Sequence, residues 1–201
     1  MLPQEKRIRT KAQLKDWLNC ELPRYPIGKL GRFLGIGEMA VLRKHQILLR
    51  KAEYYTNIGN LLLGGFYRMR LFALQTKHSL HIPMNCCAKG LRIVHLGPVL
   101  INGKAVLGEY CALHINTAIV AGGTNDLAPV LGKRVVVGVG AVILGGVQIA
   151  DYVAVGANAV VNKDVPEQGV AVAGVPAKKI SNNGSQEWNK KAKMSCTDAD
   201  K

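Results

Sequence analysis

His95, in the segment VHLGPV, and His114, in LHINTA, are the residues from which the chemistry of this chain can be approached. A neutral imidazole can take the proton of a hydroxyl near pH 7, which is the task of a general base. Each histidine alone is also consistent with a partly buried, hydrogen-bonded side chain that has no catalytic part. The positions that the surrounding chain gives these histidines decide between the catalytic and the structural interpretation.

Spacing argues against two other chemistries. The stretch GVGAVILGG (138–146) misses the GxGxxG spacing of a dinucleotide-binding turn, and no helix is predicted after it. The five cysteines are odd in number and form no CxxC pair, which fits a reducing compartment and argues against a disulfide framework or a zinc site. No metal is therefore expected.

The elements that must position the histidines follow a six-residue repeat from Ile101 onward. Of its 11 first positions, ten are aliphatic, and the exception is Asn125. The fifth positions are mostly small or β-branched, and glycine recurs at the second. A period of six predicts a parallel β-solenoid of short strands, in which the first positions stack inward from coil to coil. A β-sandwich with chance periodicity is the alternative.

Three hexads make one triangular coil, so the 66 residues of this stretch predict between three and four coils. His114 follows His95 by 19 residues, about one coil, so the two are expected to be neighbours on one side of the solenoid. The segment NDLAPV (125–130) breaks the repeat and is predicted to leave the solenoid as a loop, framed by Gly122-Gly123-Thr124. Such loops are common sites of function.

Residues 1–80 are predicted to form an α-helical subdomain. Thr10 is a plausible N-cap for a helix over 11–22, and further helices are predicted over 38–55 and about 61–74, although Gly64 and Gly65 weaken the last. The second and third helices are basic and carry aromatics, so they could lie on an anionic membrane or contact RNA, but no RNA-binding signature is present. The simpler interpretation is a solvated basic face with the aromatics packed inward.

Most of the net charge of +14 lies on these helices. Residues 1–80 hold 15 Lys and Arg against 5 Asp and Glu (+10), residues 81–180 hold 8 against 5 (+3), and residues 181–201 hold 4 against 3 (+1). Because the solenoid is nearly balanced, no nucleic-acid partner is expected for it. No apolar run reaches the roughly 18 residues of a membrane span and no secretion signal is visible, so a cytoplasmic location is expected.

The hexads, GLRIVHLGPVLING (90–103), IVAGGTNDLAP (119–129) and AGVPAKKI (173–180) together resemble the left-handed β-helix acetyltransferases. The branch they resemble most is that of the serine acetyltransferases and their relatives in surface-polysaccharide clusters. The helical segment LLRKAEYYTN (48–57) looks more like the polysaccharide-associated relatives.

The resemblance implies a mainly β fold. An N-terminal α-helical subdomain (1–80) would precede a left-handed parallel β-helix (81–180), and a polar, flexible tail (181–201) would follow. It also implies homotrimers that transfer acetyl from acetyl-CoA to a hydroxyl, with acetyl-CoA lying between neighbouring solenoids. The helices could then dock peripherally on the inner membrane face, where lipid-linked sugars reside.

His95 stands where the family's catalytic histidine stands, which implies a general base that takes the hydroxyl proton as oxygen attacks the thioester. His114 is assigned a supporting role, and a corner residue without a catalytic part is the alternative. The aspartate that pairs with the catalytic histidine in the family has no match, because Leu80 stands at its place. Glu109, Asp126 and a backbone carbonyl are the candidates to orient His95.

Two departures bear on the acceptor. Serine acetyltransferases carry Asp-His where this chain has Val94-His95, and Arg-His where it has Leu127-Ala128. The missing Asp and Arg are implicated in holding the amine and carboxylate of the amino acid, and such contacts are each worth about 1.5–3 kcal/mol. Their absence favours a sugar hydroxyl in surface-polysaccharide biosynthesis. Serine O-acetylation in cysteine biosynthesis is the alternative, and a non-catalytic trimeric scaffold is a third.

The resemblance also implies residues that bind acetyl-CoA. Backbone N–H groups near the thioester could stabilise the developing oxyanion, and cations could meet the phosphates, although ordinary surface charge is the alternative for each lysine. The implied positions are Gly123 and Thr124 beside the thioester and pantetheine arm, Val139 and Ala157 along the pantetheine, and Lys163, Lys178 and Lys179 at the phosphates.

Overall fold

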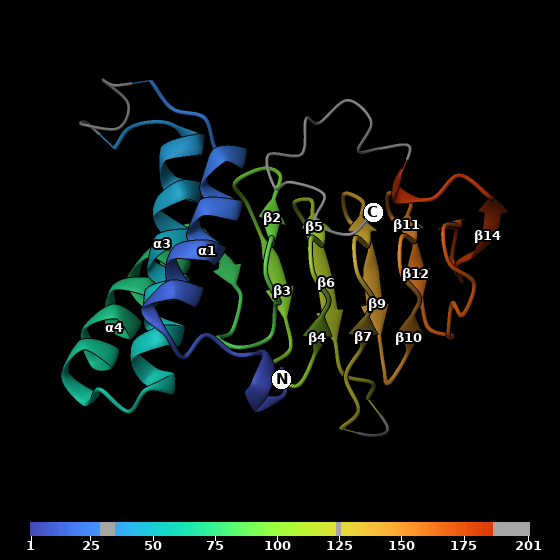
Figure 1. The fold of residues 1–201 in the computed structure, drawn as a ribbon. Helices are drawn as coiled ribbons and strands as arrows, with labels where there is room; N and C mark the ends of the chain where they lie inside the picture. The colour runs from blue at the N-terminus through green and yellow to red at the C-terminus, as the bar shows by residue number, and fades with distance from the viewer. Residues whose placement is uncertain (29–34, 124–125, 187–201) are drawn as a thin grey trace.

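The fold, taken from a computed structural model, is described for residues 1–28, 35–123 and 126–186. Helices gather at one end of a stack of short strands, which runs away from them to β14 at the opposite end (Figure 1). The α-helices are α1 (Lys11–Glu21), α3 (Glu38–Asn57) and α4 (Leu61–Lys77). None of the helices described is long and apolar enough to cross a membrane.

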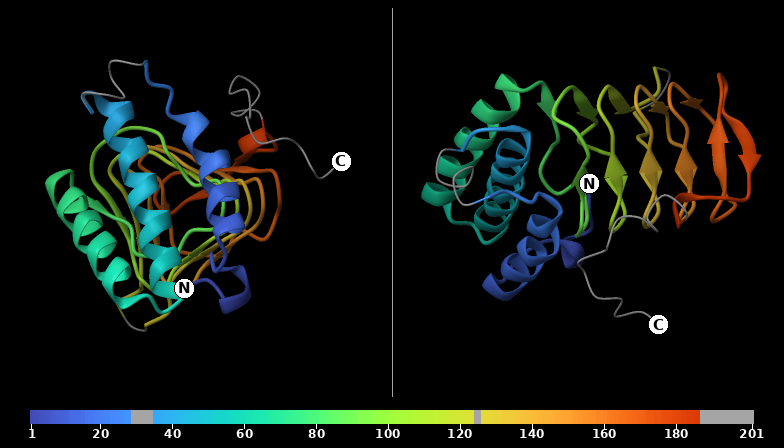
Figure 2. Two further views of the ribbon diagram at one scale, coloured as in Figure 1. Left: turned by 60° about the vertical axis from the view of Figure 1, so that its left-hand side comes forward. Right: turned by 90° about the horizontal axis from the view of Figure 1, so that it is seen from above.

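The strands form three sheets that enclose one core, seen nearly end-on behind the helices in Figure 2. The three sheets are named A, B and C, and their strands are given below. Each coil contributes a strand to sheet C, then to sheet A, then to sheet B, and all pairings are parallel except β13 with β14. The fold is therefore the predicted left-handed parallel β-helix. Sheet A holds β1 (Leu80–His81), β3 (Val99–Ile101), β6 (Thr117–Val120), β9 (Val142–Leu144) and β12 (Val160–Val161); sheet B holds β4 (Val106–Leu107), β7 (Val130–Leu131) and β10 (Gln148–Ile149); sheet C holds β2 (Arg92–Ile93), β5 (Ala112–Leu113), β8 (Val136–Val137), β11 (Ala154–Val155), β13 (Ala171–Ala173) and β14 (Lys178–Ser181).

The hexad pattern builds the core of the solenoid. All ten aliphatic first positions are at most 3% exposed, as the repeat predicts. The stack is longer than the hexads alone indicate, because β1 and β2 precede Ile101 and β13 and β14 extend beyond the repeat. The predicted loop is present between β6 and β7, and of its residues Thr124 and Asn125 lie outside the part that is described.

The two tyrosines of the solenoid lie outside the narrow core. Tyr110 and Tyr152 occupy turns with φ of 61°, and the guanidinium carbon of Arg134 lies 5.0 Å and 5.9 Å from their ring centroids. Neither of these bulky rings therefore occupies the interior of the coil.

The N-terminal helices begin where the sequence predicts. Thr10 and Gln13 form a capping box on α1, and the side chain of Asn60 caps α4. Gly64, which weakens α4 by propensity, is buried against α3: a Cβ there would lie 3.4 Å from Thr56 Oγ1. The glycine thus lets the two helices approach closely.

A buried ion cluster joins the helices to the first solenoid turns. Arg50, on α3, is fully buried and pairs with Glu21 at 2.7 Å and Glu53 at 2.8 Å. Its guanidinium also donates to the carbonyls of Cys87 and Ala88. Burial disfavours a charge unless it is paired and hydrogen-bonded, and here three elements supply the partners.

Three findings refine the expectations for the periphery. The inward packing of aromatics is wrong for Phe66 and Phe72, which are 44% and 71% exposed. Among the cysteines, Cys86, Cys87 and Cys111 are free and buried. Ser185, in the predicted tail, still contacts the solenoid, since its hydroxyl donates to the carbonyl of Arg134. The domain boundaries remain predictions.

Candidate active site

His95 and His114 lie beside each other at the corner where the chain passes from sheet C to sheet A. His95 follows β2 and His114 follows β5, and these strands pair in parallel with Ile93 opposite Leu113. The two ring centroids are 6.3 Å apart. The spacing of about one coil therefore does bring the histidines together, and the side chain of His95 is 57% exposed.

A carboxylate from the helical region faces this corner. Glu38 Oε1 lies 3.4 Å from His95 Nδ1 and accepts a hydrogen bond of 2.6 Å from the Leu96 amide. Glu38 is the first residue of α3, where the helix dipole favours a negative charge. The preceding residue, Gly37, has a φ of 98°, a conformation that glycine adopts at little cost.

Glu38 was missed by reasoning from the sequence because it belongs to another element than the histidine motif. The available signal was a lone acidic residue at the predicted start of a basic helix. The structure brings none of the predicted carboxylates to His95. Glu109 lies 3.9 Å from Lys133, and Asp126 pairs with Lys104 at 2.8 Å, which lowers the pKa of Asp126.

The surroundings of the second histidine disfavour its charged form. Burial lowers the pKa of His114, and the nearby charges of His95 and Arg92 lower it further. The carbonyl of His114 accepts a hydrogen bond of 2.9 Å from Thr117 Oγ1, which fixes the turn. An imidazole at this position can hydrogen-bond a hydroxyl beside His95. Arg92, which the sequence did not single out, places a cation close to the pair.

The same corner continues along the solenoid through two of the predicted coenzyme residues. Val139 follows β8 and Ala157 follows β11, and the amide of Asn158 donates to the carbonyl of Val139 at 2.8 Å. At the end of this edge, Lys178 in β14 pairs with Ala173 of β13 and is exposed. His95, His114, Val139, Ala157 and Lys178 thus lie along one edge of the prism.

Other predicted residues lie elsewhere in the chain. Gly123 follows β6 and Lys163 follows β12, so both lie at the corner between sheets A and B. Thr124 is outside the described residues. Lys179 forms an ion pair with Glu167. Within one chain, Gly123 and Lys163 do not share the edge that carries the histidines.

The residues that depart from the family pattern supply no charge. Val94 directly precedes His95, and its amide donates to the carbonyl of Leu113 at 2.9 Å. Leu127 is 61% exposed and covers Gly146, where a Cβ would lie 2.7 Å from the Leu127 Cβ. Leu80, in place of the family's aspartate, is buried in β1.

A hollow of about 400 Å³ adjoins the histidine turns on the outer side of sheet A. Its lining includes Pro98 and Asn116, which follow His95 and His114 in the chain, and Thr117. Within the described residues there is no group of three or more His, Cys, Asp or Glu side chains that could hold a metal ion. What the corner offers is an imidazole pair, one carboxylate and one guanidinium.

Comparisons with known proteins agree with this architecture. Residues 128–163 match the bacterial transferase hexapeptide family (six repeats). The chain is 37% identical over 100 residues to the serine acetyltransferase of Synechococcus elongatus, covering 48% of this chain and 40% of the relative. It is 28% identical over 151 residues to that of Buchnera aphidicola subsp. Schizaphis graminum, covering 72% and 56%. The chain therefore spans about half the length of the curated relatives it matches.

Solved structures show the same fold over a larger share of the chain. The serine acetyltransferase of Brucella abortus in complex with coenzyme A aligns with a TM-score of 0.65 at 21% identity, covering 87% of this chain and 70% of that one. The serine acetyltransferase of Neisseria gonorrhoeae in complex with serine aligns with a TM-score of 0.62 at 22% identity, covering 85% and 70%. Together with the hexads and the coil, these matches identify the chain as a hexapeptide-repeat, left-handed β-helix protein similar to the serine acetyltransferases.

Proposed function

We propose that this chain transfers an acetyl group from acetyl-CoA to the hydroxyl of serine. The observation that carries the proposal is the exposed His95, whose Nδ1 lies 3.4 Å from Glu38 and whose ring lies 6.3 Å from that of His114. The curated relatives are named serine acetyltransferases, and solved neighbours are complexes with coenzyme A and with serine. These names support the substrate pair.

In the proposed mechanism, Glu38 holds the proton of His95 on Nδ1, which leaves Nε2 free to accept. The separation of 3.4 Å is slightly long for a hydrogen bond, and such contacts commonly tighten when substrate binds. Nε2 takes the hydroxyl proton as the oxygen forms a bond to the thioester carbon. The carbon–sulfur bond then breaks, and the same proton passes to the departing sulfur of CoA. The products are O-acetylserine and free CoA.

Acetyl-CoA would lie along the edge that carries the histidines. From His114, after β5, to Lys178, in β14, this edge crosses four strand spacings, or about 19 Å at the usual 4.7–4.9 Å per strand. The exposed turns at Val139 and Ala157 lie between them and would meet the pantetheine arm. Lys178 would then reach the phosphates, where a cation is favourable.

A homotrimer would complete this site. Gly123 and Lys163 lie at the corner between sheets A and B, away from the histidine edge of the same chain. If both corners contact one acetyl-CoA, as the family resemblance implies, they must come from neighbouring copies. Mixing two inactive variants, one at His95 and one at Lys163, tests this, because shared sites would restore part of the activity.

The expectation of a sugar acceptor finds no support among these relatives, and serine, the alternative, fits better. The charged contacts missing at Val94 and Leu127 have a partial replacement in Arg92, whose charge already acts on His114. A guanidinium there would bind the carboxylate of serine. An uncharged sugar hydroxyl stays the second candidate, because Val94, Leu127 and Ala128 offer an amino acid no charged contact.

The test is the release of CoA thiol from acetyl-CoA with L-serine, D-serine or a panel of neutral sugars as acceptor. Stimulation by L-serine alone supports the proposal, whereas stimulation only by a sugar replaces serine with the second candidate. An Arg92→Ala variant should raise the KM for L-serine about ten- to 150-fold, in line with a charged hydrogen bond of about 1.5–3 kcal/mol. Absence of acetyl-CoA binding in calorimetry would instead favour a scaffold.

A further inference from the structure

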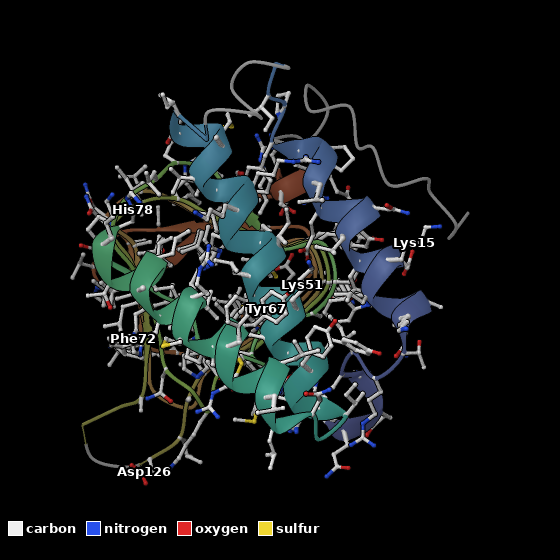
Figure 3. The ribbon with its side chains drawn as sticks, turned by 90° about the vertical axis from the view of Figure 1, so that its left-hand side faces the viewer. Lys15, Lys51, Tyr67, Phe72, His78 and Asp126 are labelled. Carbon is white, nitrogen blue, oxygen red and sulfur yellow. The ribbon has the colours of Figure 1, made fainter. Side chains whose placement is uncertain are left out.

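The outer side of α4 carries an exposed apolar surface that the proposed acetyl transfer does not use. Leu61 and Leu62 are 88% and 87% exposed, and Met69 and Phe72 are 65% and 71% exposed. Phe66 adds a further half-exposed ring. Figure 3 shows Tyr67 directed toward Lys51 of α3, whereas Phe72 lies on another side of α4. Large apolar side chains gathered in this way usually mark a contact surface.

The buried residues of α4 and its exposed apolar residues lie on opposite sides of the helix. At 100° per residue, the buried Gly64, Leu71 and Leu74 share the side packed on the rest of the protein. Leu62 and Met69 lie at the centre of the opposite side. Leu61, Phe66 and Phe72 surround them, and Arg68 and Arg70 fall on its two borders. Apolar residues in the middle with arginines at the edges are the pattern of a helix lying in a lipid interface.

Charge around this outer side is positive. The segment Leu61–Lys77 contains no Asp or Glu, and the guanidinium of Arg70 lies 5.6 Å from the ring centroid of Phe66. The acid nearest along the preceding helix, Glu53, is buried in its pair with Arg50. Two copies meeting through this side would bring arginines together without acids on either α4. An anionic bilayer surface complements both the charge and the apolar centre.

A hollow beside α4 extends the surface. It has a volume of about 460 Å³, and its lining includes Met69, Phe72, Pro83 and Met84 together with Arg68. A mostly apolar hollow with a guanidinium suits an acyl chain and the phosphate of its headgroup. The helical end also lies opposite β14, so the solenoid extends away from it (Figure 2).

We propose that α4 docks this protein on an anionic phospholipid bilayer, with Leu62 and Met69 in the headgroup–acyl boundary and Arg68 and Arg70 on lipid phosphates. The proposal is independent of the acetyl acceptor. It predicts binding to vesicles of phosphatidylcholine and phosphatidylglycerol that weakens as salt rises, with little binding to phosphatidylcholine alone.

The experiment is vesicle cosedimentation of the full chain and three variants. Leu62→Ser with Met69→Ser should lower the partition coefficient at least tenfold, because both side chains lose their apolar contact. Arg68→Gln with Arg70→Gln should lower it about fivefold for each arginine, equivalent to about 1 kcal/mol each, and should flatten the salt dependence. Ile180→Ser, an exposed apolar residue on β14, is the matched control and should bind like the wild type.

Light scattering and thermal melting accompany these measurements. No binding of the wild type to anionic vesicles at low salt overturns the proposal. Unchanged vesicle binding in Leu62→Ser with Met69→Ser also overturns it, and if that variant dissociates a larger assembly, the surface is a contact between copies. If the variant unfolds, the arginine pair, which leaves the apolar packing intact, decides the question alone.

Discussion

Glu38 Oε1 lies 3.4 Å from His95 Nδ1, so a carboxylate at the start of α3 faces the imidazole that the solenoid presents. The helices thereby contribute a residue to the candidate site instead of only covering the end of the coil. The position of Glu38 depends on the start of α3 after Gly37, and the position of His95 depends on the turn after β2.

Removing the charge of Glu38 should impair catalysis more than folding. In Glu38→Gln we expect kcat to fall about ten- to a hundredfold, part of the 10²–10⁴-fold that general-base catalysis supplies, with the KM for acetyl-CoA unchanged. The amide oxygen can still accept from the Leu96 amide, so the melting temperature should stay close to that of the wild type.

Glu38→Asp should recover part of the lost kcat, and Glu5→Gln, at an exposed acid away from the site, should behave as the wild type. Equal losses in kcat and in thermal stability would contradict a positioning role for Glu38.

The two histidines should differ in their effect on rate. We expect His95→Ala to lose about 10²–10⁴-fold in kcat, the usual contribution of a general base. His114→Asn should lose no more than about tenfold, because an amide can still hydrogen-bond a hydroxyl and no proton transfer depends on it. Steady-state rates of thiol release separate these outcomes. A larger loss from His114→Asn than from His95→Ala would exchange the two roles.

The solenoid could be predicted from sequence because the six-residue pattern that forms it depends only on residues close together in the chain. Each aliphatic first position faces the core regardless of distant segments, so Ile101 and Val161 occupy equivalent places 60 residues apart. The neighbourhood of His95 and His114 followed from the same period. Glu38 could not be found in this way, since its place depends on how α3 packs on the coil. The exposed Phe72 was missed for a related reason, because propensity does not tell which side of a helix is covered.

The buried ion cluster predicts a large and specific stability effect. Arg50→Met should cost about 3–5 kcal/mol of unfolding free energy, because Glu21 and Glu53 would remain buried without their cation. Adding Glu21→Gln and Glu53→Gln to the same chain should restore part of this loss, since the uncompensated charges are then removed. Denaturant unfolding measures both values. If the triple variant were less stable than Arg50→Met alone, the cost would arise from packing and not from charge.

His45 makes the stability of the helical region dependent on pH. The ring is fully buried, lies 3.3 Å from Gln46 Oε1 and 3.1 Å from Gln75 Nε2, and burial lowers its pKa from 6.5 to about 4. The folded chain therefore holds fewer protons than the unfolded chain between these pH values, so unfolding free energy falls as pH drops from 6.5 toward 4. The difference amounts to about 3 kcal/mol, and it is absent above pH 7.

Thermal unfolding of the wild type and of His45→Gln between pH 4 and pH 8 measures this contribution. Glutamine keeps a hydrogen-bonding side chain but binds no proton, so the variant should lose less stability on acidification than the wild type does. His81→Gln, at an exposed histidine in β1, should leave the wild-type slope unchanged. Parallel pH profiles for His45→Gln and the wild type would mean that the acid sensitivity comes from other groups, of which the buried carboxylates around Arg50 are the next to test.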